Sequence, residues 1–179
     1  MSKLVKFEVI PFAAARVIGR MAVCCMNEGV YNPVPQMWKD MLADGSFDML
    51  KSMPERATDE PDTVGWMGEY DPQTNSFNYI AGVLVKPDTP VPPGFVYRDI
   101  PACEMGVGWI QGSDSNGDVY SNAHNHTAEA MQANGYEYDY SKGGFELEYY
   151  SDSRFVKKRI NGEDLLIMDY YSPCKKMSK

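Results

Sequence analysis

The segment 145–150, Phe-Glu-Leu-Glu-Tyr-Tyr, combines two carboxylates with aromatic rings, the residue types that attract organic cations. A strand period of two places Glu146 and Glu148 on one face, with Leu147 and Tyr149 on the other. One interpretation is the solvated face of an edge strand. The other is that one carboxylate points into an aromatic cleft, where charge and ring contacts hold a cation. The pattern leaves both interpretations open.

Aromatic residues make up 12% of the chain and gather on the predicted strands. Buried Trp and Tyr need hydrogen-bond partners, whereas a core built for stability alone uses mainly Leu, Ile and Val. Core packing explains most of these rings, and an aromatic-lined ligand cleft is the second interpretation. The candidate lining of such a cleft, with Glu148 as the charge partner, is Trp66, Tyr79, Trp109 and Tyr150.

Patterns for metal, nucleophile or nucleotide chemistry are weak. His124 and His126 would lie about 200° apart on a helix, so they would not converge on one ion. The polar run 114–118 lacks the glycine that an EF-hand loop needs at its sixth position. The chain has no Gly-x-Ser-x-Gly elbow, no Gly-x-Gly-x-x-Gly turn and no Gly-Lys-Ser/Thr loop. We therefore expect no metal site, no cofactor and no nucleotide chemistry.

The charge balance argues against a nucleic-acid partner. The 179 residues include 17 basic and 25 acidic ones, for a net charge of -8. Proteins bind nucleic-acid backbones by placing Lys and Arg on phosphates, and the one dense basic cluster, 157–159, lies beside Glu163 and Asp164. We expect no direct nucleic-acid binding, and the acidic charge favours encounters with cationic partners.

The composition is that of a globular domain, with 44% hydrophobic residues. Apolar stretches such as 21–26 are far shorter than the ~20 residues that cross a bilayer, and the first residues lack the apolar run of a secretory signal. The four cysteines, at positions 24, 25, 103 and 174, show no metal-binding spacing and suit small apolar roles in a reducing compartment. We expect a soluble, cytoplasmic protein with no membrane partner.

Periodicity predicts strands and a helical region early in the chain. Alternation over 3–11 indicates a half-buried strand, and 15–25 is predicted as a second strand that pairs back on the first. A helix is expected to enter at 32–35 and to stop at Gly45, or to resume through 47–53.

A hairpin is the next predicted feature. After a polar loop over 54–62, strands at 63–70 and 76–85 flank a turn that begins with Asp-Pro. The Pro-rich segment 86–94 can join neither a ladder nor a helix, so it is predicted to connect two halves of the chain.

The later part of the chain repeats this order. Strands are predicted over 95–100 and 104–111, a helix over about 121–133, and strands over 145–150 and 164–171. The Ile-Pro pairs at 10–11 and 100–101 occupy matching places, each between two strands and upstream of a helix.

This duplication predicts an α+β fold. Two strand–helix–strand–strand units related by a pseudo-twofold axis would form a mainly antiparallel sheet with two long helices on one side. We expect one domain over 1–179, with repeat halves at about 1–88 and 92–179.

With these features in place, the sequence resembles the GyrI-like, AraC-type effector-binding domain family. The marks of the resemblance span almost the whole chain, and their order and spacing are more specific than any one of them. They are Phe-Glu-Val-Ile-Pro-Phe at 7–12, Val-Ile-Gly at 17–19, Val-Gly-Trp at 64–66 with Tyr-Asp at 70–71, Phe-Asn-Tyr-Ile-Ala-Gly-Val at 77–83, Val-Pro-Pro-Gly-Phe at 91–95 with Ile-Pro-Ala at 100–102, and Leu-Glu-Tyr-Tyr at 147–150.

The resemblance implies a small-molecule receptor fold with a ligand cleft at the junction of its two units. The family's acidic ligand-binding position falls on Glu148, although Glu146 two residues earlier offers a second register. Family regulators carry a helical DNA-binding region ahead of this domain, whereas here the first strand begins close to Met1, so DNA binding does not carry over. This pattern implies a stand-alone receptor or a regulator that works with a protein partner.

We therefore predict a binding module for amphipathic, aromatic or cationic small molecules, with a role in transcriptional regulation or in multidrug or toxin response. Some stand-alone members of the family that it resembles hydrolyse cyclopropane-bearing genotoxins with an acidic residue and aromatic rings. A hydrolase of that kind is the alternative, with Glu148 as the catalytic residue, because a carboxylate whose pKa burial has raised can activate water. The same side chains serve both hypotheses.

Overall fold

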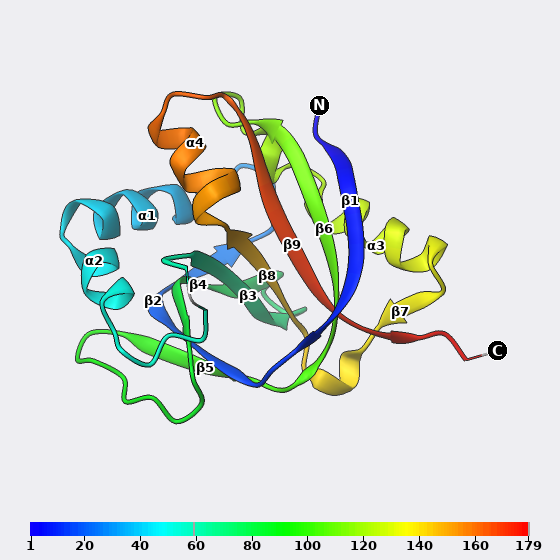
Figure 1. Ribbon diagram of the computed structural model, residues 1–179, viewed down its shortest axis with the longest axis horizontal. Helices are drawn as coiled ribbons and strands as arrows, with labels where there is room; N and C mark the ends of the chain where they lie inside the picture. The colour runs from blue at the N-terminus through cyan, green and yellow to red at the C-terminus, as the bar shows by residue number, and fades with distance from the viewer. Residues whose placement is uncertain (59, 179) are drawn as a thin grey trace. The chain divides into compact units, whose positions relative to one another are not determined.

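The chain forms two compact units in the computed structural model, which describes residues 1–58 and 60–178. Unit 1 comprises Met1–Ala13 and the chain from Ala102 onward, and unit 2 comprises Ala14–Pro101. Both units combine antiparallel strands with helices (Figure 1). Across the described residues, no helix has the length and apolar character needed to cross a membrane.

The elements follow one another along the chain in this order: β1 (Lys3–Phe12), β2 (Ala15–Cys25), α1 (Val34–Ala43), α2 (Ser46–Lys51), β3 (Thr63–Asp71), β4 (Ser76–Val85), β5 (Val96–Ile100), β6 (Cys103–Ser113), η1 (Asp118–Tyr120), α3 (Ala123–Ala133), β7 (Tyr136–Tyr138), η2 (Tyr140–Lys142), β8 (Phe145–Tyr150), η3 (Asp152–Val156), α4 (Lys157–Ile160) and β9 (Leu165–Lys176).

In unit 2 the strands lie in the order β5-β2-β4-β3, with antiparallel neighbours throughout. β3 and β4 form the predicted hairpin. At its turn the Asp71 carboxylate accepts hydrogen bonds from the Gln73 backbone N–H at 2.9 Å and from the Thr74 hydroxyl at 2.8 Å. Asp at the start of a turn supplies these local bonds, which is why the Asp-Pro pair marked the hairpin correctly.

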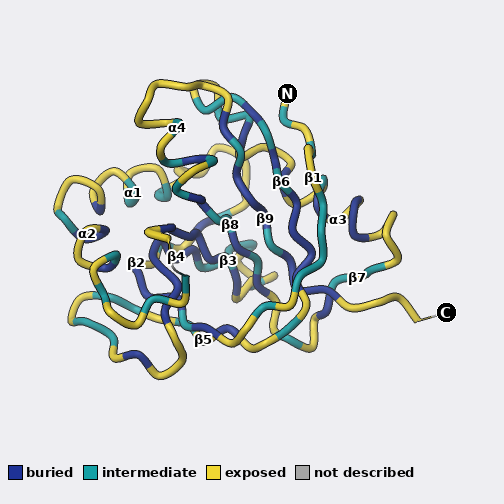
Figure 2. The backbone as a smooth tube through the Cα atoms, in the orientation of Figure 1, coloured by how far each residue is buried: buried dark blue, intermediate teal, exposed yellow. Residues whose placement is uncertain are grey.

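In unit 2, helix α1 packs against β2 and β4, and helix α2 packs against β4. The first begins where the Asn32 side chain accepts a hydrogen bond from the Val34 N–H at 3.0 Å. Gly45, with φ at 79°, turns the chain between the two helices, as predicted, because glycine adopts this left-handed conformation without steric cost. The hydrophobic core of this unit includes Ile18, Met41, Phe47, Leu50, Ala81 and Val83. Figure 2 shows the buried stretch of β4 in dark blue.

In unit 1 the strands lie in the order β1-β6-β9-β8, and the short β7 pairs with the far end of β9. Helix α3 packs on β6, β7 and β9. Two glycines of β6 permit this close approach: an added Cβ on Gly108 would lie 2.4 Å from the Thr127 Oγ1 of α3, and one on Gly106 would lie 2.7 Å from Met131 Cγ. The two glycines of β6 therefore allow α3 to pack closely against this strand.

The two units share one element order, and this confirms the predicted duplicated, mainly antiparallel α+β fold. β2, α1 with α2, β3 and β4 in unit 2 match β6, α3, β8 and β9 in unit 1, with β5 and β1 as the added edge strands. Within the described residues two helices reach ten residues, α1 with 10 and α3 with 11. These are the two long helices that periodicity predicted.

One predicted pairing is wrong. β1 pairs with β6 over the register Lys3–Gln111 to Phe12–Cys103, whereas β2 pairs with β4 and β5. Neighbours in sequence pair often, but the period-two pattern of a strand carries no information about its partner. The Pro-rich segment 86–94 also differs from expectation, since it joins β4 to β5 inside unit 2 and does not connect the units.

Candidate functional site

Strand register divides the side chains of unit 1 between two faces. Glu148 on β8 lies opposite Tyr170 on β9, and Tyr170 lies opposite Gly108, which faces α3. Successive strand residues alternate sides, so Trp109 and its opposite residue Asp169 lie on the other side. We call the side that carries α3 the helix face and the other side the reverse face.

On the helix face, three side chains hold the Glu146 carboxylate. The Tyr170 hydroxyl donates to it at 2.6 Å and the Ser172 hydroxyl at 2.9 Å, while His124 Nδ1 of α3 lies 2.9 Å away. The Glu146 side chain is only 17% exposed. This carboxylate is therefore part of an internal hydrogen-bond network and does not belong to a solvated strand face.

Glu148 shares the helix face and lies among phenol rings. Its carboxylate accepts a 2.6 Å hydrogen bond from the Tyr150 hydroxyl, and the residue is half-buried. The Tyr150 ring is buried and packs edge-on against Phe155, with centroids 4.8 Å apart. A half-buried carboxylate beside aromatic rings can attract a cation by charge and by ring contact, so the geometry fits the second interpretation of this segment.

Burial and the two carboxylates set the titration of this face. Burial raises the pKa of Tyr170 well above its usual value, and Glu146 and Glu148 raise it further. Burial and the hydrogen bond to Asp114 raise the pKa of Tyr120, and Glu148 adds the smallest contribution. The hydrogen bond to Glu146 raises the pKa of His124. The phenols thus stay protonated as hydrogen-bond donors, and the local field favours positive charge.

Trp109 lies on the reverse face and contacts cationic side chains. The Lys6 Nζ lies 4.3 Å from its ring centroid, and the guanidinium carbon of Arg154 lies 4.2 Å from it. Glu148 and Trp109, which were predicted to line one cleft, therefore lie on opposite faces of unit 1.

The two predicted site residues of unit 2 also point to different sides. Trp66 lies opposite Ile80, the residue after Tyr79, so Trp66 and Tyr79 face opposite ways. Tyr79 is 3% exposed in the core under α1 and accepts a 3.2 Å hydrogen bond from Trp38 Nε1. Trp66 is 5% exposed, with the guanidinium carbon of Arg98 at 5.9 Å from its ring. Core packing accounts for Tyr79.

Within unit 1 the structure thus brings together Glu148 and Tyr150, and sequence reasoning missed several of the side chains around them. Tyr170 and Ser172 were not selected, although Tyr170 lay inside a predicted strand. Their link to Glu146 depends on the β8–β9 register, for which the sequence carries no signal. Arg154, which contacts Trp109, comes from a segment where no element was predicted.

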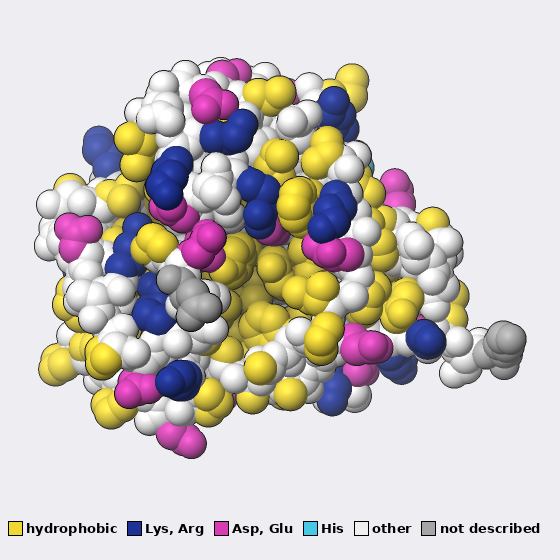
Figure 3. Space-filling view, viewed as in Figure 1, with side chains coloured by type: hydrophobic (Ala, Val, Ile, Leu, Met, Phe, Trp, Pro, Cys, Tyr) yellow, Lys and Arg dark blue, Asp and Glu magenta, His cyan; other side chains and the backbone are white. Residues whose placement is uncertain are grey.

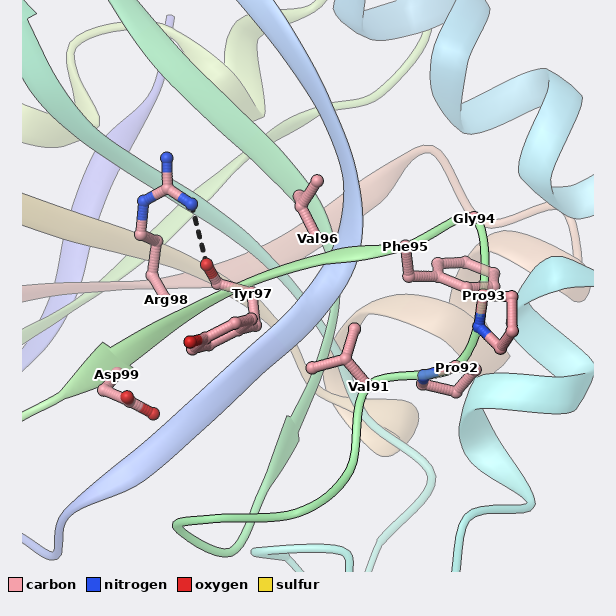
Figure 4. Close-up of a pocket in the computed structure, with 9 residues that line it drawn as sticks. All are labelled: Val91, Pro92, Pro93, Gly94, Phe95, Val96, Tyr97, Arg98 and Asp99. Carbon is pink, nitrogen blue, oxygen red and sulfur yellow. Dashed lines mark hydrogen bonds between the residues drawn. The ribbon is translucent and has the colours of Figure 1, made fainter.

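Unit 2 carries a separate open hollow of about 720 Å³, lined by the segment that runs into β5 (Figure 4). Its walls are mostly apolar, and at one end the Arg98 guanidinium donates to the Tyr97 carbonyl at 2.7 Å. The lining residues are Val91, Pro92, Pro93, Gly94, Phe95, Val96, Tyr97, Arg98 and Asp99. None of the predicted site residues belongs to this list.

Over residues 1–58 and 60–178, no three His, Cys, Asp or Glu side chains are grouped so that they could hold a metal ion. His124 binds Glu146, while the His126 ring lies 3.3 Å from the Ser2 hydroxyl. Within the described part of the chain the four cysteines form no disulfide bond.

Comparison with known families gives one match that spans most of the chain. Residues 14–173 match the family described as integron-associated effector binding protein, Cass2. None of the curated proteins matches the chain.

Solved structures share the fold at low identity. SAV2435 bound to tetraphenylphosphonium aligns with a TM-score of 0.68 at 12% identity, over 96% of this chain and 94% of that one. The integron cassette protein of Vibrio cholerae aligns with a TM-score of 0.53 at 11% identity, over 97% and 99% of the two chains. The C-terminal domain of EcmrR aligns with a TM-score of 0.56 at 12% identity, over 96% and 98%.

Proposed function

The chain belongs to the Cass2 family of integron-associated effector binding proteins, and on this premise we propose that it is a receptor for amphipathic aromatic cations. The family match and the fold shared with effector-binding domains confirm the resemblance to GyrI-like effector-binding domains. Family membership supports small-molecule binding in general. The preference for cations rests on the helix face of unit 1.

The observation that carries this preference is the position of Glu148. Its carboxylate is half-buried, lies opposite Tyr170 and accepts a hydrogen bond from Tyr150 at 2.6 Å. Glu146 lies two residues away on the same face, so two acidic groups share one aromatic environment. A desolvated cation placed there gains both charge attraction and contact with ring faces.

A relative supports the same ligand chemistry. SAV2435 was solved with tetraphenylphosphonium, a cation whose charge is surrounded by four phenyl rings. Such a ligand requires the combination of aromatic contact and negative potential that Glu148 and Tyr150 supply here. We assign Glu148 and Tyr150 to the ligand site, and a lining role for Trp66 stays a prediction. Trp109 lies on the opposite face of unit 1 from Glu148, and Tyr79 packs in the core of unit 2, so neither is assigned to this site.

Isothermal calorimetry with tetraphenylphosphonium tests the proposal. Glu148→Gln keeps the side-chain shape and removes the charge, so the cation should lose about 1 to 3 kcal/mol of binding free energy. Triphenylphosphine oxide, a neutral ligand with three phenyl rings, should bind both proteins about equally. Equal affinity of the cation for wild type and Glu148→Gln would contradict the assignment.

Glu146→Gln is the matched control on the same strand and face. Because Tyr170, Ser172 and His124 already hold Glu146, its charge should matter less to the ligand than that of Glu148. A larger loss of affinity for Glu146→Gln than for Glu148→Gln would move the charge partner two residues along β8 and contradict the assignment of Glu148.

The hydrolase alternative makes a separate prediction. A receptor returns its ligand unchanged, whereas a hydrolase of cyclopropane-bearing genotoxins would release a ring-opened hydrate. Incubation with a cyclopropane electrophile, followed by mass spectrometry of the small molecule, separates the two. The roles in transcriptional regulation and in drug or toxin response, and a regulatory protein partner, stay predictions.

A further inference from the structure

A buried carboxylate on the reverse face of unit 1 is neutralised from within the chain. The Asp169 side chain is 1% exposed, and the Arg154 guanidinium is paired with it through Nη2, with Nε 3.3 Å from Oδ1. Two nitrogens of one guanidinium thus approach the two oxygens of one carboxylate. This fork arrangement is the strongest geometry by which a carboxylate recognises a planar cation.

The same guanidinium also lies on an aromatic ring. Its carbon is 4.2 Å from the centroid of Trp109, which is the residue opposite Asp169 in the β6–β9 register. Indole is the best cation–π partner among the side chains. Asp169 and Trp109 therefore supply charge and ring contact to a single cation position, and Arg154 fills it.

More rings lie beside this position. Tyr149 on β8 is the residue opposite Asp169 on its other side, and its ring lies 5.4 Å from that of Tyr171. Phe12 of β1 packs edge-on against Tyr171, with centroids 6.3 Å apart. An aromatic ring attached to a bound cation would therefore have further rings of the reverse face as neighbours.

Arg154 is held by a short, irregular segment and not by a strand. It lies in η3, a five-residue π-helix that follows β8, and its side chain is 30% exposed. The next residue, Phe155, packs on Tyr150 of the helix face, so the two neighbours reach opposite faces of the sheet. Single-turn π-helices are rare and occur frequently at functional sites.

The surrounding charges favour a cation over an anion. Lys6, the second cation on the Trp109 ring, is paired with Glu8 at 2.8 Å, so it is already neutralised. Removal of the Arg154 guanidinium would leave the buried charge of Asp169 as the dominant field. Elsewhere too, basic side chains lie beside acidic and hydrophobic ones on the face shown in Figure 3.

We propose that Asp169 and Trp109 form a second ligand site, for planar amidinium or guanidinium groups on an aromatic body, and that Arg154 occupies this site until such a ligand displaces it. The site lies on the opposite face of unit 1 from Glu148, so it does not depend on the proposed function of the helix face. Arg154 acts as an internal competitor. The ligand binds only those molecules in which Arg154 has left the site. Its apparent association constant is therefore the intrinsic constant multiplied by the fraction of molecules with a vacant site.

Benzamidine is the probe, because it joins an amidinium to one phenyl ring, and benzamide is its neutral counterpart. Wild type should bind benzamidine weakly and saturably at millimolar concentrations, followed by tryptophan fluorescence and calorimetry. Arg154→Ala removes the competitor and should raise the affinity about tenfold or more, as expected if the site is vacant in one molecule in ten or fewer. Benzamide should bind neither protein.

Two further variants locate the site. Asp169→Asn removes the charge and should abolish benzamidine binding. If this variant does not fold, Trp109→Phe takes its place as the test and should weaken benzamidine binding several-fold. Arg98→Ala is the matched control, because Arg98 also pairs with a carboxylate, Glu69, at 2.5 Å near a tryptophan, but that carboxylate is 43% exposed. It should not raise the affinity.

Several results would overturn the proposal. Failure of wild type to bind benzamidine while Arg154→Ala binds it would show that Arg154 is a permanent structural partner of Asp169. Equal affinity in wild type and Arg154→Ala, or binding of benzamide as tight as that of benzamidine, would rule out competition for a charged site. A gain in Arg98→Ala equal to that in Arg154→Ala would place the binding elsewhere.

Discussion

Glu146 and Tyr170 are joined across β8 and β9 by a 2.6 Å hydrogen bond in which the phenol donates to the carboxylate. Both side chains are withdrawn from solvent, with Glu146 at 17% and Tyr170 at 5% exposure. A hydrogen bond to a charged, mostly buried group contributes more to stability than one between neutral groups. The pair therefore anchors the strand that presents Glu148.

Tyr170→Phe tests this anchor. The variant keeps the ring and removes the donor, so the free energy of unfolding should fall by about 1.5 to 3 kcal/mol, measured by urea denaturation. Tyr140→Phe, at a tyrosine that is 78% exposed, should change it by less than about 0.5 kcal/mol. A loss for Tyr170→Phe no larger than that of the control would mean that the phenol contributes nothing to holding Glu146.

The His124–Glu146 contact predicts a pH dependence of stability. The hydrogen bond to Glu146 raises the pKa of folded His124 above its unfolded value of about 6.5. The stabilisation is therefore complete below that unfolded value and is lost as pH rises through the folded pKa. His124→Gln should accordingly cost more stability at about pH 5.5 than at about pH 8.5, in denaturant titrations at both values.

The background variant Glu146→Gln separates this effect from a general loss of packing. Without the carboxylate, His124→Gln should cost the same at both pH values, because the source of the raised pKa is gone. A pH-dependent cost that persists in this background would assign the effect to another group.

The local elements were predictable because their signals are local. β1 follows from alternation, the β3–β4 hairpin follows from an Asp-Pro turn, and the break between α1 and α2 follows from Gly45. The pairing of β1 with β6 was not predictable, because a period of two specifies a face but no partner.

The candidate site was predictable only along one strand. Alternation placed Glu146 and Glu148 on one face, and the structure keeps them there. Whether Trp109 shares that face depends on the register of β6 with β9 and of β9 with β8. These registers are set by pairing between strands that lie far apart in the sequence, so no local pattern reveals them. The sequence around Arg154 shows no periodic pattern, because a five-residue π-helix has too few residues to show one.

The close approach of β2 and β4 at Gly19 and Gly82 makes unit 2 sensitive to one methyl group. The two glycines are paired directly, and a Cβ on Gly82 would lie 2.0 Å from the Ile18 carbonyl oxygen. A backbone atom in a paired strand cannot move aside, so Gly82→Ala should lower the free energy of unfolding by about 3 kcal/mol or more. Chemical denaturation of the purified variant measures this.

Gly144→Ala is the control for Gly82→Ala. A Cβ at Gly144 meets no described atom within 4 Å, so the substitution should change stability by no more than about 0.5 kcal/mol. Equal stability of the two alanine variants would show that β2 and β4 can separate at no cost, contrary to their tight pairing.

Thr127 of α3 carries a hydroxyl that is buried against β6. The residue is fully buried, and within the described part of the chain its Oγ1 has no hydrogen-bond partner. A buried hydroxyl without a partner costs about 1 to 3 kcal/mol relative to its hydration, whereas Val and Thr have similar helix propensities. Thr127→Val, which replaces the hydroxyl by a methyl group, should therefore raise the free energy of unfolding by about 1 kcal/mol.

Thr127→Ala removes the hydroxyl and a methyl group together, so the lost packing should cancel that gain. Thermal and urea denaturation of the three proteins give the comparison, and a Thr127→Val variant less stable than wild type would show that the hydroxyl is satisfied in solution.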